Sequence, residues 1–177
     1  MRSIRRRLPP AMSLPAWGGG IALGAELLTN GGFEGVYDDE SSGGGGTVNI
    51  APNWNNFGSE LDGTDTLDET ADAHGGSKAQ EITVNAANEG VTSAATIVFA
   101  SGKRYYFELY IKGVAGKVRI FDGAAAIIDE TFTPSTGVYR RYYFIRAGST
   151  TSQRIYITSG DAGAHFIVDD VSVKEIL

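Results

Sequence analysis

Aromatic and charged side chains alternate along several short segments of the chain, a combination that can recognise sugars. In segment 104–112, Tyr106, Glu108 and Tyr110 share one face, because alternate residues of an extended strand point the same way. Aromatic rings stack on the C–H faces of sugars, while guanidinium and carboxylate groups hydrogen-bond hydroxyls. The candidate ligand-binding residues that share this chemistry are Trp54, Tyr106, Glu108, Tyr110, Phe121, Arg141, Tyr143 and Tyr156.

Three other interpretations of these side chains stay open. Neighbouring aromatic and charged residues also form ordinary cross-strand pairs, which stabilise a sheet by about 0.2–1 kcal/mol each. Tyrosine and arginine are enriched at protein–protein interfaces as well. The strand order, which a sequence does not give, could instead separate the candidates from one another.

The sequence offers few residues that could form a catalytic site. Glycoside hydrolysis needs two carboxylates placed across a groove, and Glu108 is the one acid on the aromatic face. The acids between Asp62 and Asp72 form a run that is typical of a solvated loop. The chain has two histidines, His74 and His165, and no cysteine. It therefore has too few ligands for a histidine-rich metal site and none for a thiolate site. We therefore expect a protein that is not an enzyme.

The charge distribution excludes further classes. Residues 1–24 carry four arginines and no acid, so the remaining residues carry −10 when the whole chain carries −6. Nucleic-acid binding needs a basic surface, so we expect none through this acidic part. A membrane span is not expected either, because no apolar run approaches the roughly 18 residues required.

The elements that must position these side chains are short strands. Runs with a two-residue hydrophobic period alternate with turn residues, a pattern typical of a β-sandwich. The expected strands are 78–84, 92–99, 104–112, 117–121, 126–132, 138–146, 154–158 and 165–174. Segment 38–76 is expected to be a long excursion with one or two short strands. A jelly roll is the sandwich that we favour, since it limits exposed edges.

The first 24 residues differ from the rest. Arginines precede a proline pair and glycines follow Trp17, so neither a stable helix nor a stable strand is expected there. We divide the chain into an extended basic arm, residues 1–24, and a jelly-roll body, residues 25–177. The arm is expected to anchor the protein to other subunits; an uncleaved targeting segment and a disordered tail are the alternatives. The arm residues proposed to make these contacts are Arg5, Arg6, Arg7, Leu8, Leu14 and Trp17.

Four motifs in the body resemble a known family. The body opens on Leu-Leu-Thr-Asn-Gly-Gly-Phe-Glu (27–34) and closes on Phe-Ile-Val-Asp-Asp-Val-Ser-Val (166–173). Between them lie Ala-His-Gly-Gly-Ser-Lys-Ala (73–79) and Gly-Lys-Arg-Tyr-Tyr-Phe (102–107). This order resembles the jelly-roll carbohydrate-binding modules found beside xylanases and cellulases, a type that also occurs in phage tail and capsid-surface proteins. The resemblance covers about residues 26–176.

The resemblance implies a structural calcium ion that joins the first strand to the last. Its ligands would be Glu34, Asp169 and backbone oxygens around Gly76 and Lys78, since calcium takes about six to eight oxygen ligands. Strand alternation places Asp169 on one face with Ile167, Val171 and Val173 if no bulge interrupts the strand. The alternative is two acids near turns whose oxygens accept hydrogen bonds from backbone N–H groups.

Together, an arm and one such module predict a structural or display protein of a larger assembly. The expected protein is a phage virion component, namely a capsid decoration, tail or fibre protein, present as a homo-oligomer at the virion surface. The alternative is an extracellular glycan-binding module that acts in polysaccharide or host-surface recognition.

Overall fold

The computed structural model describes residues 21–39, 47–58 and 64–177. These residues form fifteen strands and no helix, and none of them provides a helix that could cross a membrane. The arm residues Arg5, Arg6, Arg7, Leu8, Leu14 and Trp17 lie outside the described ranges. Their proposed contacts stay a prediction.

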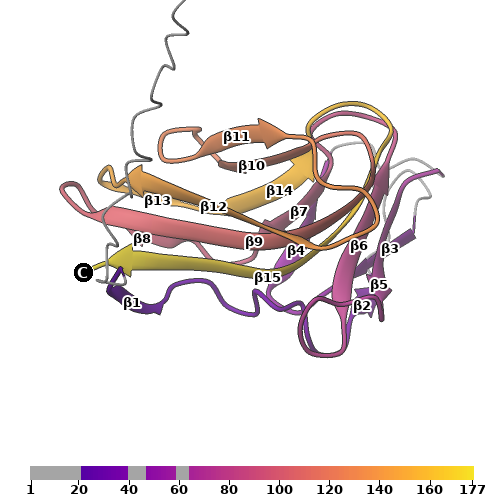
Figure 1. The fold of residues 1–177 in the computed structure, drawn as a ribbon, viewed down its shortest axis with the longest axis horizontal. Coiled ribbons are helices and arrows are strands. Elements are labelled where there is room, and N and C mark those ends of the chain that lie inside the picture. Colours follow the sequence, from indigo (N-terminus) through magenta and orange to yellow (C-terminus); the bar gives the residue numbers. More distant parts are fainter. Residues whose placement is uncertain (1–20, 40–46, 59–63) are drawn as a thin grey trace, which may run out of the picture.

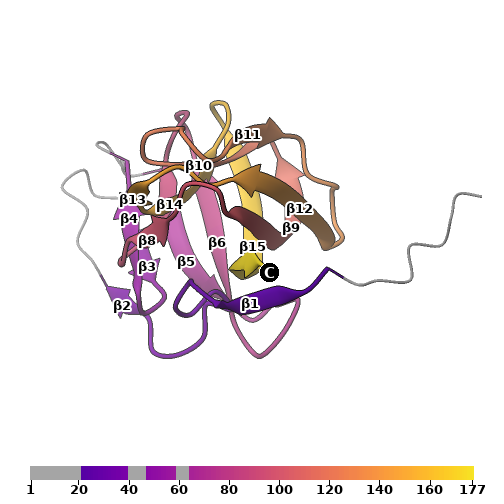
Figure 2. The same cartoon turned by 90° about the vertical axis from the view of Figure 1, so that its left-hand side faces the viewer.

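Two stacked sheets make up the body (Figures 1 and 2). The larger sheet has eight strands. All its pairs are antiparallel except that between β3 and β5. In spatial order the strands are β12 (Arg140–Ala147), β9 (Arg104–Ala115), β15 (Ala164–Ile176), β6 (Ala79–Val84), β5 (Thr66–Thr70), β3 (Thr47–Ile50) and β2 (Asp38–Asp39), and β1 (Leu23–Glu26) pairs with β15 beside this path.

The smaller sheet has five antiparallel strands, and a separate pair of strands lies beside it. The spatial order of the five is β11 (Asp129–Phe132), β10 (Val118–Asp122), β14 (Ile155–Ser159), β7 (Gly90–Ser93) and β4 (Trp54–Phe57). The additional pair is β13 (Thr151–Gln153) with β8 (Ile97–Phe99).

Alternation along each strand creates the core between the two sheets. In β9, Phe107, Leu109 and Ile111 are fully buried, whereas Glu108 and Tyr110 between them point to the other side. The smaller sheet contributes residues such as Ile120 and Ile157 to the same hydrophobic core. The all-β jelly-roll sandwich expected from the sequence is therefore confirmed.

Most expected strands are present with ends shifted by a few residues. Segment 92–99 is the exception, because it overlaps the end of β7 and contains β8, and these two strands belong to different sheets. Segment 38–76 also holds more structure than expected, since β2, β3, β4 and β5 all fall within it. Its acidic and glycine-rich composition hid these short strands.

The boundary of the body lies a few residues earlier than expected. Leu23 and Gly24, assigned above to the arm, belong to β1, and Leu23 pairs with Ile176 of β15. The backbone N–H of Leu177 also donates to the carbonyl oxygen of Ala22. The body therefore includes residues from at least Ala22 onward.

A β-bulge in β15 corrects the expected orientation of the acidic motif. The pairing of β15 with β9 shifts between Asp169 and Ser172, and Asp170 has a left-handed backbone with φ of 47°. Core residues therefore have even numbers before the bulge and odd numbers after it. Asp169 lies opposite Tyr110, on the outer face of the large sheet, and does not share the core face of Val171 and Val173.

Gly31 lies where the opening motif passes the closing one. The N–H of Val171 donates to the carbonyl oxygen of Gly31 at 2.8 Å. A Cβ atom on Gly31 would lie 1.7 Å from the carbonyl oxygen of Val171, so no side chain fits at this position. Glycine at this position therefore allows the two end motifs to approach each other this closely.

Replacing Gly31 should therefore destabilise the fold strongly. We expect Gly31→Ala to lower the free energy of unfolding by at least about 1–3 kcal/mol, the usual cost of forcing extra atoms into a packed site. Gly32→Ala is the matched control, because a Cβ there would have its nearest neighbour, Asp170 Oδ1, at 3.5 Å. Thermal and urea denaturation measure both variants. Equal stability of the two would contradict this account.

Candidate carbohydrate-binding site

Five of the candidate ligand residues lie together on the outer face of the large sheet. Tyr106, Glu108 and Tyr110 come from β9, and Arg141 and Tyr143 come from β12. Arg141 lies directly opposite Tyr110, and Tyr143 lies opposite Glu108. The sequence predicted correctly that these side chains point away from the core. Because β9 and β12 are neighbours in the sheet, the residues come into contact.

A charged network fixes the centre of this group. Arg141 Nε donates to Glu108 Oε2 at 2.6 Å, and a second guanidinium nitrogen of Arg141 contacts both Glu108 and the Tyr106 hydroxyl. The Tyr106 hydroxyl also donates to Glu108. Burial, followed by the hydrogen bond to Glu108, raises the pKa of Tyr106 to about 12, so its hydroxyl stays protonated at neutral pH.

The three tyrosines of this face differ in accessibility. Tyr143 is 60% exposed, whereas Tyr106 is 7% exposed. The ring of Tyr110 is covered by the imidazole of His74, with ring centroids 3.6 Å apart and planes 17° from parallel. Of the three, Tyr143 is therefore the most accessible; its ring stacks on that of Tyr106 with centroids 6.0 Å apart, and the Arg141 guanidinium lies 5.6 Å from its centre.

The other three candidates lie elsewhere. Phe121 on β10 and Tyr156 on β14 stack on each other at 4.8 Å on the outer face of the small sheet, where Phe57 joins them. Trp54 is 3% exposed, stacks on Phe33 and donates from its indole to the carbonyl oxygen of Asn30. The eight candidates therefore form two separate surface groups and one core residue.

A loop of residues 71–78 between β5 and β6, here called the strap, covers part of the large sheet's outer face. Lys112 Nζ binds the Asp72 carboxylate, and the Tyr139 hydroxyl donates to the Asp72 carbonyl oxygen. Ile167 and Asp169 are consequently 5% and 0% exposed although they do not face the core. The strap therefore limits the accessible face to the part that begins at His74.

Two carboxylates hold the strap by its backbone. Asp169 Oδ2 accepts hydrogen bonds from the N–H groups of His74 at 2.8 Å and Gly75 at 3.0 Å, and Oδ1 accepts from Asp170 N–H at 2.7 Å. Burial raises the pKa of Asp169, while the hydrogen bonds from Gly75, Asp170 and His74 act in the opposite direction. The N–H groups supply the compensation that a buried carboxylate needs.

Glu34 holds the other half of the strap. Its Oε1 accepts hydrogen bonds from the N–H groups of Ser77 at 2.6 Å and Lys78 at 3.0 Å, and Oε2 accepts one from the Ser77 hydroxyl. The Ser77 N–H, its hydroxyl and the Lys78 N–H lower the pKa of Glu34, in that order. Gly76 has φ of 61°, and a Cβ there would lie 2.0 Å from Glu34 Oε1. Glycine is thus required for the strap to approach this carboxylate.

The proposed calcium ligands fit the ion only in part. Glu34 and Asp169 do contact the same loop, as the resemblance implied, but their oxygens face N–H donors from it. Calcium would instead need the loop's carbonyl oxygens. In the described ranges no group of three or more acidic or histidine side chains could hold a metal ion. Calcium stays a prediction, and the hydrogen bonds match the alternative in which backbone donors satisfy both acids.

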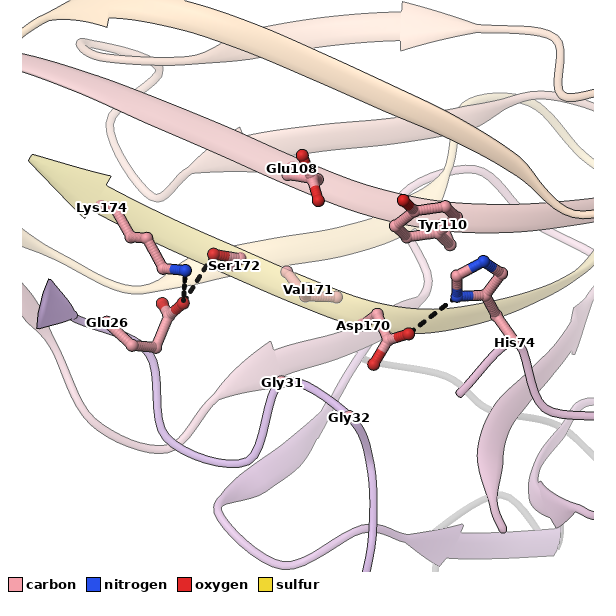
Figure 3. Close-up of a pocket in the computed structure, with 10 residues that line it drawn as sticks. All are labelled: Glu26, Gly31, Gly32, His74, Glu108, Tyr110, Asp170, Val171, Ser172 and Lys174. Atoms are coloured by element: carbon pink, nitrogen blue, oxygen red, sulfur yellow. Dashed lines mark hydrogen bonds and ion pairs between the residues drawn. The ribbon is translucent and has the colours of Figure 1, made fainter. Parts of the chain in front are cut away.

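A shallow pocket of about 470 Å³ lies beside the charged network (Figure 3). Asp170, Val171 and Ser172 of β15 form its floor, with Glu108 and Tyr110 of β9 along one side. The other lining residues are Glu26, Gly31, Gly32, His74 and Lys174. A volume of this size falls within the range of about 300–1,000 Å³ typical of small-ligand sites.

Sequence reasoning missed His74 and Glu26 as residues of this site. The position of His74 over the Tyr110 ring depends on where the strap folds. Its Nδ1 lies 2.8 Å from Asp170 Oδ2, a contact between residues 96 positions apart. Glu26 reaches the pocket through β1, where its Oε2 accepts a hydrogen bond from the Ser172 hydroxyl at 2.6 Å. No local pattern could have revealed either contact.

Comparison with known proteins gives structural matches only. No protein-family model matches the chain, and no curated protein sequence matches it. The xylan-binding domain CBM22-1 from Paenibacillus barcinonensis has a TM-score of 0.53 and 19% identity, and the match covers 86% of this chain and 96% of that one. The module TmCBM61, solved with β-1,4-galactotriose, has a TM-score of 0.54 and 17% identity over 85% of this chain and 98% of that one.

A phage protein also has this fold. The enzymatically active domain of tailspike protein 4 from bacteriophage CBA120 matches with a TM-score of 0.52 and 13% identity. The match covers 71% of this chain but 20% of that chain. Taken together, these likenesses confirm that the body has the jelly-roll fold of carbohydrate-binding modules, as the four sequence motifs indicated.

The calcium prediction can be tested by chelation. If calcium joins Glu34 to Asp169, EDTA should lower the melting temperature, because binding to the folded state alone stabilises by about 2.7 kcal/mol at a hundredfold excess over Kd. Asp169→Ala and Glu34→Gln should remove this response, and added calcium but not magnesium should restore it in the unaltered chain. Melting curves that coincide with and without EDTA would contradict the calcium prediction. The partners of both acids would then be the backbone N–H groups alone.

Proposed function

We propose that this chain is a glycan-binding module that holds its ligand on the outer face of the large sheet. The observation that carries this proposal is the juxtaposition of one exposed aromatic ring, one guanidinium–carboxylate pair and one adjoining pocket. Tyr143 supplies the ring, and Arg141 with Glu108 supplies the pair. The fold supports the same function, since xylan and galactotriose are the ligands named for two structural neighbours.

The geometry suits a sugar because polar and aromatic groups are already held in place. Arg141 is fixed by Glu108 and retains guanidinium N–H groups for sugar hydroxyls, and its side chain is 51% exposed. Tyr143 offers a ring face beside it. A pre-ordered site loses little side-chain entropy on binding, and this gain adds to the modest affinity that a single ring can supply.

The charges around the pocket favour a neutral glycan. Glu26, Glu108 and Asp170 contribute three carboxylates to its lining, against Lys174 and the imidazole of His74. Lys174 Nζ lies 3.8 Å from Glu26 and is thereby partly neutralised. A sugar with its own carboxylate would meet like charges here, so uronic acids should bind less well than neutral sugars.

We propose that the module binds glycans but does not cleave them. Glu108 is engaged by Arg141 and by the Tyr106 hydroxyl, which suits a fixed anchor better than a proton-transferring acid. Such a module would act where polysaccharides occur, outside the cell or on a host surface.

A second candidate function is the structural one expected from the arm: a virion component in which the module decorates a larger assembly. The tailspike likeness supports it, because a phage protein carries this fold. The two functions are compatible, since a virion protein can use a glycan-binding face to contact its host. We place glycan binding first because side chains of the described body support it directly.

Removing the exposed ring should weaken glycan binding strongly without unfolding the protein. We expect Tyr143→Ala to weaken binding to β-1,4-xylan or β-1,4-galactan at least tenfold in affinity electrophoresis. Tyr156→Ala is the matched control, since it removes a stacked tyrosine from the outer face of the other sheet. Greater loss in Tyr156→Ala would move the site to the small sheet, and a glycan array blank for the unaltered chain would contradict the function.

Truncation tests the structural candidate. Deleting residues 1–20 spares β1 and the Ala22 contact, so the remaining body should melt cooperatively at an unchanged temperature. If the arm anchors the protein, the truncated chain should no longer join the particle, and Trp17→Ala should weaken joining, as buried tryptophans dominate many interfaces. Sedimentation with isolated particles measures occupancy. Full occupancy by the truncated chain would contradict the anchoring role.

A further inference from the structure

The pocket has walls at both of its ends (Figure 3). At one end, Glu26 is tied to Ser172 by the 2.6 Å hydrogen bond and lies next to Lys174. At the other end, His74 is held by Asp170 and stacks on Tyr110. Each wall is therefore built from a residue of another segment that is fastened to the floor strand.

The wall at His74 is backed by the strap. Beyond Tyr110, the face continues with Lys112 and Ile167, which lie opposite each other in the pairing of β9 with β15. Lys112 is bound to Asp72 of the strap, and Ile167 is 5% exposed. A ligand lying along β9 therefore cannot continue past Tyr110 in this direction.

The long side away from β9 is closed as well. Gly31 and Gly32 line the pocket opposite Glu108 and Tyr110 (Figure 3), and the Gly31 carbonyl oxygen is bonded to Val171 of the floor. The segment containing these glycines thus lies directly against β15. The remaining side leads across β9 to β12, an edge strand of the large sheet, where Tyr143 and Arg141 are exposed.

We infer that the pocket receives the terminal residue of a glycan chain, with the adjoining residues crossing β9 to stack on Tyr143. This inference rests on the proposed glycan-binding function and specifies its ligand. A site bounded on three sides admits one end of a linear chain, whereas an internal stretch needs an open path on both sides. Carboxylates and backbone groups around the pocket can accept hydrogen bonds from the extra hydroxyl that only a terminal residue carries.

Counting binding sites on a polymer before and after shortening tests this inference. Titration calorimetry of the full chain would use a panel of β-1,4-xylan, β-1,4-galactan and mixed-linkage β-glucan. Each polymer is measured intact and after limited cleavage by an endo-acting hydrolase that doubles its chain ends. End recognition predicts about twofold more sites per gram after cleavage, at an unchanged Kd. It also predicts that affinity stops rising beyond an oligosaccharide of about three sugars, the length that pocket and Tyr143 can accommodate.

A variant of the His74 wall gives a second measurement. His74→Ala uncovers the Tyr110 ring but keeps the backbone N–H that binds Asp169, so the strap should stay in place. We expect this variant to bind the same number of sites per gram as the unaltered chain but with at least a threefold change in Kd, because the imidazole that bounds the terminal residue is gone while the strap still blocks the path past Tyr110. His165→Ala is the matched control: it also removes an imidazole bound to a carboxylate, Glu81, but lies outside the pocket lining.

The outcomes are distinguishable. Sites per gram that do not change on cleavage, with affinity that keeps rising to six sugars, would overturn end recognition while leaving glycan binding intact. No binding to any member of the panel would instead contradict the proposed function itself. A Kd for His74→Ala equal to that of His165→Ala and of the unaltered chain would show that His74 does not bound the terminal residue.

Discussion

Asp169 carries a fully buried carboxylate on the face of the large sheet that does not contact the core. Burying an uncompensated charge costs several kcal/mol, so an arrangement of this kind persists only where donors surround the group. Here the donors are the backbone N–H groups of His74, Gly75 and Asp170. The position of the strap, and with it the shape of the outer face, therefore depends on satisfying this one acid.

The bulge in β15 makes this arrangement possible. Without the shift at Asp169–Ser172, the motif would keep a single alternation and Asp169 would share a face with the core residues Val171 and Val173. The left-handed backbone of Asp170 also turns its carboxylate toward His74, which then covers Tyr110. The irregular pair thus contributes to covering Tyr110.

The sequence predicted the fold far better than the site, for physical reasons. Alternation in β9 and β12 correctly placed Tyr106, Glu108, Tyr110, Arg141 and Tyr143 outward, because the hydrophobic period is local. Grouping Phe121 and Tyr156 with them required the strand order, which depends on contacts between distant residues. Trp54 was chosen for its side-chain type, yet its ring fills the core against Phe33. The roles of His74 and Glu26 depend on long-range contacts of the same kind, and no spacing rule could supply them.

The pairing of β1 with β15 also determines how the body would respond to a pulling force. Leu23 pairs with Ile176, so the outer ends of both strands lie side by side. Tension between these two ends would load their hydrogen bonds one after another, and bonds loaded singly break at lower force than bonds sheared together. β1 would be the first strand to peel away, taking Glu26 and one wall of the pocket with it. A module tethered through both ends would thus lose this side of the pocket under load before its core opened.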